Sequence, residues 1–353
     1  MTDVMGTRTG AQVPPTLSVE QAIDRLCAGE SLTEAAVEAL FAEVVADRMG
    51  EAQLAGLLVA LKAKGEAVEE LVGAARALRA AALPFPRPGG LFADTCGTGG
   101  DGSGTINIST AVAFAAAACG LPVVKHGNRS ITSRCGSADV LERLGARLDL
   151  SPEASRQLLD RVGVCFLFAP HYHPGMRHAG PVRKALGVRT IFNMLGPCLN
   201  PALPPVQIVG VPSPALVEPI AHTLHALGCT RALVVHGSGL DEIALHGPTA
   251  AMQVSDGHFG LFEITPELAG VGRAPLSAIA GGGPEENAAR LVALLEGKGS
   301  EAEQAMVAIN AGALLMLAGL HPDLRSATRA ALDALESGAA GERLHAFVET
   351  SRA

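Results

Sequence analysis

The chain of 353 residues contains no tryptophan and a single tyrosine, Tyr172, and aromatic residues make up 3% of it. Proteins that hold single-stranded nucleic acid stack bases on aromatic side chains, and this chain offers few of them besides ten phenylalanines. Its net charge of -8 also lacks the excess of Lys and Arg that neutralises phosphates in non-specific nucleic-acid binding. A nucleic-acid binder is therefore disfavoured, and any site for a polyanion must be local.

Cysteine pairs and long apolar runs are missing as well. The seven cysteines form no CxxC pair that would suggest zinc or a redox dithiol, so reduced cytoplasmic thiols are the simplest interpretation. The N-terminal stretch lacks the apolar core of a signal peptide. The longest apolar runs, 111–124 and 305–320, are too short and too interrupted to cross a membrane. We expect a cytoplasmic protein without a membrane segment.

The N-terminal quarter of the chain has a helical pattern. We expect a flexible tail over 1–16 and then consecutive helices without strands. The first long helix is predicted to open at Ser31 and Glu34, spaced as a capping box, and to close at Gly50; further helices follow over 51–64 and 66–82. The prolines and glycines of 83–90 mark a domain boundary. These features predict a helical domain over 17–84.

Beyond this boundary short apolar runs alternate with helical segments, which predicts an α/β domain over 88–345 with a mostly parallel central sheet. The apolar runs end at Ala93, Val124, Ala169, Val211 and Val235. The helical segments include 109–119, 137–144, 152–162 and 214–227. A hairpin is expected to turn at Asp256 and Gly257, and three helices are expected from Pro284 to the end.

The first loop of this domain, "GTGGDGSG", is rich in glycine. Gly97, Gly99 and Gly102 satisfy GxGxxG, so a dinucleotide site has to be considered. Such a site needs an acidic residue about twenty positions later to hold the ribose. No Asp or Glu occurs in the 37 residues between Asp101 and Asp139, which disfavours a dinucleotide.

Basic and hydroxyl side chains gather in this acid-free stretch. They are Ser109, Thr110, Lys125, Arg129, Ser130, Thr132, Ser133 and Arg134. Main-chain amides of the glycine loop, together with the start of a helix near Ser109, suit a phosphate, assisted by a helix dipole of about half a charge. Two adjacent donor-rich loops favour a phosphate pocket over a structural turn with incidental surface charges.

Three further features suggest chemistry. In "KHGNR", Lys125 supplies a point charge, while His126 either packs or acts as a general base. Asp241 and Glu242 follow an apolar run, where they could face Mg²⁺ together with substrate phosphates or simply form a solvated turn. The segment 171–197 is rich in histidine and arginine, but its histidine spacing does not match a zinc pair; an arginine there could bind an organic carboxylate.

Several motifs in this order closely resemble the anthranilate phosphoribosyltransferase family of tryptophan biosynthesis. They are GTGGD, NIST, KHGNR, GSADVLE, PVRKALGVRTIFNMLGP, NP and GLDEI. The resemblance covers nearly the whole chain after the tail. It implies a helical domain that includes part of 172–200, a homodimer formed through the helical domains, and Mg²⁺-dependent transfer of phosphoribose from phosphoribosyl pyrophosphate (PRPP) to anthranilate, with two Mg²⁺ per subunit.

The resemblance also implies roles for residues at matching positions. PRPP would be held by Gly97, Gly100, Asp101, Thr105, Asn107, Ile108, Ser109, Thr110, Lys125, His126, Gly127, Asn128, Arg129, Ser130, Ile131, Thr132, Ser133 and Ser137. Anthranilate would contact Gly97, Asn128 and Arg183, and magnesium would bind Ser109, Asp241 and Glu242. Lys125 and His126 are the candidate catalytic residues. Thr132-Ser133 and Cys198-Leu199 depart from the usual serine pair and "LT" of the family.

Two other functions are compatible with parts of this pattern. Pyrimidine nucleoside phosphorylases share the expected fold, but their glycine and lysine loop differs from "KHGNR". A non-catalytic relative that binds nucleic acid would have a basic face and degraded phosphate loops, whereas this chain is acidic and keeps both loops.

Overall fold

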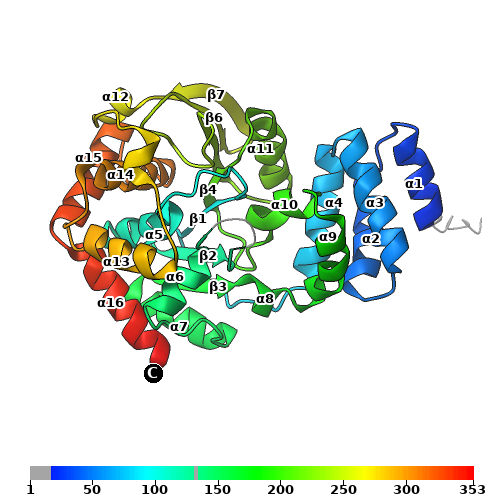
Figure 1. Ribbon diagram of the computed structural model, residues 1–353, viewed down its shortest axis with the longest axis horizontal. Coiled ribbons are helices and arrows are strands. Elements are labelled where there is room, and N and C mark those ends of the chain that lie inside the picture. The colour runs from blue at the N-terminus through cyan, green and yellow to red at the C-terminus, as the bar shows by residue number, and fades with distance from the viewer. Residues whose placement is uncertain (1–16, 131–133) are drawn as a thin grey trace, which may run out of the picture.

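The computed structural model describes residues 17–130 and 134–353, which form a small helical unit beside a larger α/β unit (Figure 1). The predicted tail, 1–16, and the predicted PRPP contacts Ile131, Thr132 and Ser133 lie outside these residues. Within the described ranges, no helix has the length and apolar character needed to cross a membrane.

The helical unit contains four consecutive helices: α1 (Val19–Cys27), α2 (Glu34–Val45), α3 (Glu51–Lys64) and α4 (Val68–Ala80). The predicted capping box at Ser31 is wrong, because Thr33 caps α2 and accepts a hydrogen bond from the Ala36 amide. Glu34 pairs with Arg76 of α4 instead of turning back to its own helix. The helix also ends at Val45, before Gly50, which serves as the N-cap of α3.

The α/β unit is built on one seven-stranded sheet in the order β3-β2-β1-β4-β5-β6-β7. The strands are β1 (Ala93–Gly97), β2 (Val123–Gly127), β3 (Val164–Phe168), β4 (Val206–Gly210), β5 (Arg231–Gly237), β6 (Thr249–Ser255) and β7 (His258–Ile264). The first five are parallel and the last two antiparallel, which confirms the predicted fold class. The hairpin prediction is also confirmed, with left-handed φ values of 47° at Asp256 and 82° at Gly257.

The first strand begins at Ala93, where the sequence pattern predicted that an apolar run ends. The reason is Asp94, a fully buried acid inside the strand. It accepts hydrogen bonds from Asn200 Nδ2 at 2.8 Å and from the His126 amide at 3.3 Å. Burial raises the pKa of Asp94, and nearby Lys125 opposes that rise. A polar residue with these partners is stable in a position where periodicity alone expects an apolar one.

Helices cover both faces of the sheet. One face packs against α5 (Ile108–Ala118), α7 (Pro152–Val162), α14 (Glu301–Leu317) and α16 (Ala339–Arg352). Outside this layer, α13 (Pro284–Leu295) packs on α5 and α16, α15 (Leu324–Glu336) packs on α14, and α6 (Ser137–Arg143) packs on α13. On the other face lies α11 (Val217–Ala226). The prediction of three C-terminal helices is wrong; four follow Gly283, because Gly297, Gly319 and Gly338 each adopt left-handed backbone after the end of a helix.

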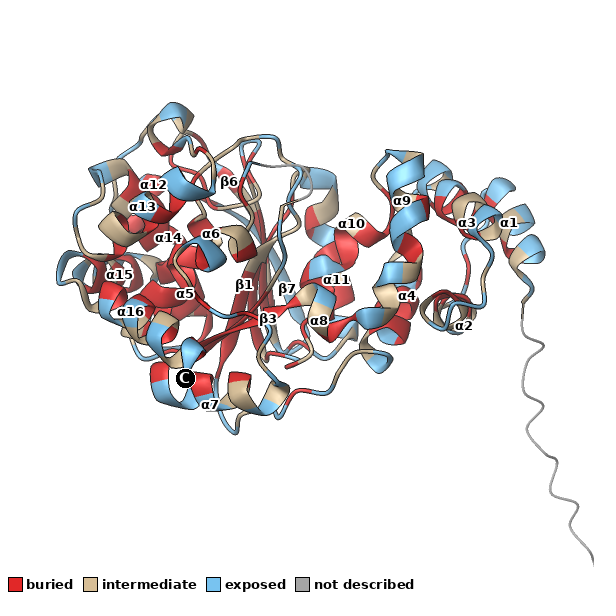
Figure 2. Cartoon of the chain, turned by 60° about the horizontal axis from the view of Figure 1, so that its bottom comes forward, coloured by how far each residue is buried: buried red, intermediate tan, exposed pale blue. Residues whose placement is uncertain are grey.

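The second face of the sheet shares one apolar core with the helical unit. Val209 and Val234 of the sheet belong to the same buried cluster as Leu224 of α11 and Phe41 and Leu57 of the helical unit. Figure 2 shows α10 (Phe192–Leu195) and α11 between the sheet and α4. The two units are therefore held together by continuous apolar packing.

Hydrogen bonds reinforce this junction. Arg79 of α4 is largely buried, and its guanidinium donates to the Cys198 carbonyl at 2.6 Å and the Leu227 carbonyl at 2.9 Å. The connecting helices α8 (Ala169–Tyr172) and α9 (Gly180–Leu186) return the chain to the helical unit, where α9 contacts α3. Residues of 172–200 thus lie against helices formed a hundred residues earlier.

Glu70 is the buried charge on which the helical unit depends. It is 0% exposed and accepts hydrogen bonds from the amides of Leu32 (2.9 Å) and Ala67 (2.8 Å) and from Lys64 Nζ (2.9 Å). We expect Glu70→Ala to lower the free energy of unfolding by about 3–5 kcal/mol, because it leaves a buried ammonium group unpaired. Urea denaturation measures this loss. Glu69→Ala, at the exposed neighbouring position, should change it by less than about 1 kcal/mol.

Candidate active site

Four parallel strands end in glycine at the same edge of the sheet: Gly97, Gly127, Gly210 and Gly237. A Cβ atom on Gly97 would lie 2.1 Å from Asp241 Oδ2, and one on Gly210 would lie 1.5 Å from the Asp241 carbonyl oxygen. At Gly237 the clash would be with the Glu242 carbonyl, at 2.2 Å. The acidic turn can therefore lie across the strand ends only because these residues lack side chains.

Three acidic residues lie near one another where this turn crosses the strands. Asp241 Oδ2 accepts a hydrogen bond from the Gly99 amide at 2.7 Å, and the Asp241 amide donates to Asp101 Oδ2 at 3.4 Å. Glu242 accepts a hydrogen bond from the hydroxyl of Ser109, at the start of α5. The glycine loop, α5 and the acidic turn thus converge, although they are up to 142 residues apart in the sequence.

The acids carry more negative charge than their surroundings neutralise. Burial, followed by the charges of Asp101 and Glu242, raises the pKa of Asp241 well above its ordinary value. Burial raises the pKa of Glu242 to about 7, although the Ser109 hydrogen bond and the charge of Lys125 oppose that rise. Two carboxyl groups whose charged forms are disfavoured are suited to a cation that would stabilise them.

The donor set suits Mg²⁺ rather than a metal held by protein alone. Across the described ranges, no three His, Cys, Asp or Glu side chains converge on one point as a complete metal site. Mg²⁺ prefers oxygen ligands and commonly uses one or two carboxylates together with substrate phosphates and water. Asp241, Glu242 and the Ser109 hydroxyl supply oxygen ligands of this kind.

Anion donors lie beside the acids. Gly99, Gly100, Gly102 and Gly104 all have positive φ values, from 62° to 79°, so the loop exposes main chain without side chains. The following helix, α5, has no side-chain cap on its first amides and no acid in its first turn. Its cap residue Asn107 instead donates to the Cys135 carbonyl at 3.2 Å. The predicted residues Ile108, Ser109 and Thr110 therefore begin a helix whose amides suit phosphate.

The two candidate catalytic residues are both buried at the end of β2. Lys125 Nζ donates to the Thr95 carbonyl at 2.6 Å, and its charge acts on Asp94 and Glu242. The His126 ring packs edge-on against His173, with ring centroids 5.1 Å apart, and burial lowers the pKa of His126 well below its ordinary value. This environment keeps His126 neutral and favours packing over proton transfer.

The second predicted phosphate loop follows β2. Arg129 forms two hydrogen bonds with Glu142, at 2.6 and 3.0 Å, and lies 4.6 Å from the Phe168 ring centroid. Ser137 donates to the Asn128 carbonyl at 3.3 Å, which ties the loop to the start of α6. The Arg129 guanidinium thus already has a carboxylate partner, one that the sequence pattern did not indicate.

Arg183 lies on α9 with its guanidinium 5.2 Å from the centroid of the Phe192 ring. Burial lowers the pKa of Arg183, and no charged neighbour among the described residues alters it. A partly buried cation without a carboxylate partner suits an organic carboxylate. The predicted residue Thr105 is paired with Ala280 by a single antiparallel bridge.

Sequence reasoning missed two buried asparagines that support the site. Asn200 Nδ2 donates to Asp94 and to the Val124 carbonyl, both at 2.8 Å, and so joins β1 to β2. Asn287 of α13 donates to Asn107 Oδ1 at 2.9 Å, behind the start of α5. The only sequence signal for the first is the "NP" motif; the second has none.

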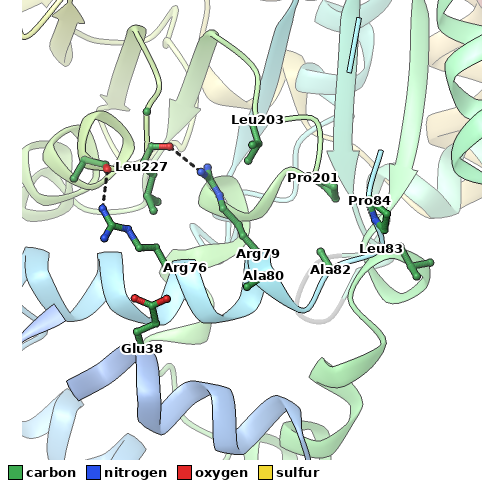
Figure 3. A pocket seen from close by; sticks show the side chains of 12 residues that line it. Glu38, Arg76, Arg79, Ala80, Ala82, Leu83, Pro84, Pro201, Leu203 and Leu227 are labelled. Atoms are coloured by element: carbon green, nitrogen blue, oxygen red, sulfur yellow. Dashed lines mark hydrogen bonds between the residues drawn. The ribbon is translucent and has the colours of Figure 1, made fainter. Parts of the chain in front are cut away.

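A separate cavity of about 670 Å³ lies between α4 and α11 (Figure 3). Its walls include Arg76, Arg79 and Glu38, but none of the predicted site residues. Both arginines donate to main-chain carbonyls, of Ala226 and Leu227. This cavity belongs to the junction of the two units, and the strand-end site remains the candidate for chemistry.

Comparisons with known proteins show the family of this chain. Residues 89–341 match the glycosyl transferase family, a/b domain, and residues 20–82 match the helical bundle domain of the same family. The anthranilate phosphoribosyltransferase of Sorangium cellulosum is 58% identical over 330 residues, which cover 94% of this chain and 95% of that protein. The chain belongs to the anthranilate phosphoribosyltransferase family.

Solved structures of this family have the same fold. The Thermus thermophilus anthranilate phosphoribosyltransferase has a TM-score of 0.89 at 43% identity, covering 94% of this chain and 99% of that one. The Saccharomyces cerevisiae enzyme, in complex with PRPP and Mg, has a TM-score of 0.82 at 27% identity, covering 96% and 94%. The predicted family is confirmed.

The raised pKa of Glu242 predicts a pH-dependent stability. The neutral carboxyl is favoured in the folded state, so its contribution is fully present below about pH 4.5 and is lost as the pH rises through about 7. In metal-free buffer, the thermal unfolding midpoint of Glu242→Gln should rise relative to wild type between about pH 5 and about pH 8. Glu263→Gln, at an exposed position, is the control. A constant difference between Glu242→Gln and wild type would contradict the assignment.

Proposed function

We propose that this chain transfers the 5-phosphoribosyl group of PRPP to the amine of anthranilate, giving N-(5-phosphoribosyl)anthranilate and pyrophosphate in tryptophan biosynthesis. The observation that carries the proposal is the convergence of a glycine loop, an uncapped helix start and an acidic turn at one edge of the sheet. Membership of the family supports the identity of both substrates.

PRPP would bind at the strand ends. The glycine loop, the first amides of α5 and the loop after β2 would surround its phosphates, because they supply main-chain and hydroxyl donors. The complete set remains as predicted: Gly97, Gly100, Asp101, Thr105, Asn107, Ile108, Ser109, Thr110, Lys125, His126, Gly127, Asn128, Arg129, Ser130, Ile131, Thr132, Ser133 and Ser137. In this proposal Arg129 exchanges its Glu142 partner for a phosphate oxygen.

Magnesium would be held by Ser109, Asp241 and Glu242, with two ions per subunit. Bound Mg²⁺ neutralises charge on the departing pyrophosphate. The chain contributes the carboxylates that fix its position, and Lys125 adds a buried positive charge near Glu242. The Saccharomyces cerevisiae relative in complex with PRPP and Mg supports the choice of metal.

Anthranilate would contact Gly97, Asn128 and Arg183, with the guanidinium facing its carboxylate. The amine nitrogen then forms a bond to the anomeric carbon while the carbon–oxygen bond to pyrophosphate breaks, through an oxocarbenium-like transition state. The pyrophosphate leaves with the electron pair, and the nitrogen loses a proton. An aromatic amine is already unprotonated at neutral pH, so a strong base is unnecessary; this agrees with the enclosed position of His126. Orientation and fixed charges supply the catalysis.

The remaining organisation follows the family resemblance. In this proposal 17–84 and part of 172–200 form a helical domain that joins two subunits, 88–345 forms the catalytic domain, and 1–16 is a tail. The enzyme would act in the cytoplasm.

A fluorescence assay tests the proposed activity. Purified protein should consume anthranilate when PRPP is present, and removal of Mg²⁺ with a chelator should stop the reaction. Phosphate-dependent cleavage of thymidine or uridine, with no loss of anthranilate, would instead identify a pyrimidine nucleoside phosphorylase. Salt-dependent binding of DNA without turnover would identify a non-catalytic relative.

Replacing one acid of the cluster should slow the reaction. Asp241→Asn keeps an oxygen that can accept the Gly99 amide but removes a charge that would hold Mg²⁺. We expect kcat to fall about 10²- to 10³-fold, as for loss of one transition-state electrostatic contact. Steady-state rates at saturating PRPP and Mg²⁺ measure the effect. A rate near that of wild type would exclude the proposed role of this acid.

Arg183→Ala separates the two substrates. Loss of a charged hydrogen bond to the carboxylate should raise the KM for anthranilate about 10- to 100-fold and leave that for PRPP nearly unchanged. Arg177→Ala, an exposed arginine one turn before α9, is the matched control. Equal increases in both KM values would show that Arg183 does not face anthranilate.

A further inference from the structure

Arg189 joins the segment after α9 to the glycine loop, ninety residues earlier in the sequence. Its Nη2 donates to the Gly99 carbonyl and its Nη1 to the Gly100 carbonyl, both at 3.1 Å. The side chain is partly buried, and it follows Gly187, where left-handed backbone with φ of 62° ends α9. One guanidinium group thus binds two consecutive peptide groups of the loop.

Because the peptide bond is planar, this contact also sets the direction of two N–H groups of the loop. In a trans peptide the carbonyl and the following N–H point in opposite directions. Fixing the Gly99 and Gly100 carbonyls on Arg189 therefore directs the N–H groups of Gly100 and Asp101 away from the guanidinium. The Gly99 amide is fixed separately by Asp241 Oδ2 at 2.7 Å. Three consecutive peptide groups are thus oriented by two side chains from different parts of the chain.

This stretch of loop would otherwise be free to reorient. Gly99 and Gly100 have φ values of 71° and 79°, and glycine loses more conformational freedom on ordering than any other residue. Space at Gly100 is also required, because a Cβ atom there would lie 2.6 Å from Arg189 Nη1. The guanidinium further polarises the two peptide groups, which makes their N–H groups stronger donors.

We propose that Arg189 is a positioning residue that holds the glycine loop so that the Gly100 and Asp101 amides face the diphosphate of PRPP. The inference rests on the proposed function for the identity of that ligand. Arg189 lies six positions after Arg183, so the same contact ties the segment proposed to bind anthranilate to the loop proposed to bind PRPP. Lysine cannot replace it fully, because an ammonium group lacks the planar fork that binds two carbonyls.

The test compares three variants of the full-length enzyme. Arg189→Ala should raise the KM for PRPP about tenfold or more, the effect of losing charged hydrogen bonds, while the KM for anthranilate changes less than about twofold. Arg189→Lys should give an intermediate KM for PRPP. Lys184→Ala removes the same charge from an exposed position on α9 and should leave both KM values unchanged.

Hydrogen exchange of the ligand-free protein gives a readout that does not depend on turnover. Peptides covering 97–104 should exchange faster in Arg189→Ala than in wild type or Lys184→Ala, with unchanged protection in β1 and α5. If wild type shows no transfer, the proposed function fails. The exchange comparison then still tests whether Arg189 holds the glycine loop. Transfer by wild type together with an unchanged KM for PRPP in Arg189→Ala overturns the inference.

Two further outcomes would contradict the proposal that Arg189 positions the glycine loop. Equal increases in both KM values, or loss of protection throughout the α/β unit, would assign Arg189 a purely structural role. If Arg189→Ala does not fold, Arg189→Lys decides: wild-type KM for PRPP and wild-type exchange of the loop would overturn the proposal.

Discussion

The approach of Asp241 and Glu242 to the strand ends is the contact on which the candidate site depends. Gly97, Gly210 and Gly237 permit it, since any side chain there would displace the acidic turn. The approach removes the two acids from water and places them near Asp101, so their charged forms are disfavoured. A bound cation would stabilise the charged forms of both acids. The donors of the glycine loop and α5 then suit the anion that accompanies the cation. Backbone packing thus sets the electrostatics of the site.

The fold supports this arrangement from both faces of the sheet. On one side α5 brings Ser109 to Glu242, while α13 holds Asn107 from behind through Asn287. On the other side an apolar core continues into the helical unit, and α9, which carries Arg183, packs against α3 of that unit. The cation proposed for anthranilate is therefore supported by the helical unit, whereas the donors for phosphate lie at the strand ends.

Much of this architecture could be predicted from periodicity and from the family motifs, because alternating apolar runs and helices specify a parallel sheet. The sequence pattern did not predict the hydrogen-bond partners of buried polar residues. Buried Asp94, hydrogen-bonded to Asn200, interrupts the apolar pattern of the first strand, so the pattern did not reveal that strand. Near the expected capping box, the Leu32 amide donates to the distant Glu70. Partners distant in sequence were also hidden: nothing near Arg129 indicated Glu142, and nothing near Gly100 indicated Arg189. Among the glycines that the sequence pattern assigned to a ligand site, Gly97 also makes room for the acidic turn, as do Gly210 and Gly237, which the pattern did not single out.

The apolar core shared by the two units constrains recombination between the gene segments that encode them. Residues 83–90 separate the two units along the chain, yet Val209 and Val234 pack in the same cluster as Phe41 and Leu57. A gene fragment that encoded only the α/β part would yield a product with an uncovered apolar wall, prone to aggregation. Recombination at this linker therefore gives a folded protein only when the apolar faces of the two units fit each other. This favours inheritance of both units together.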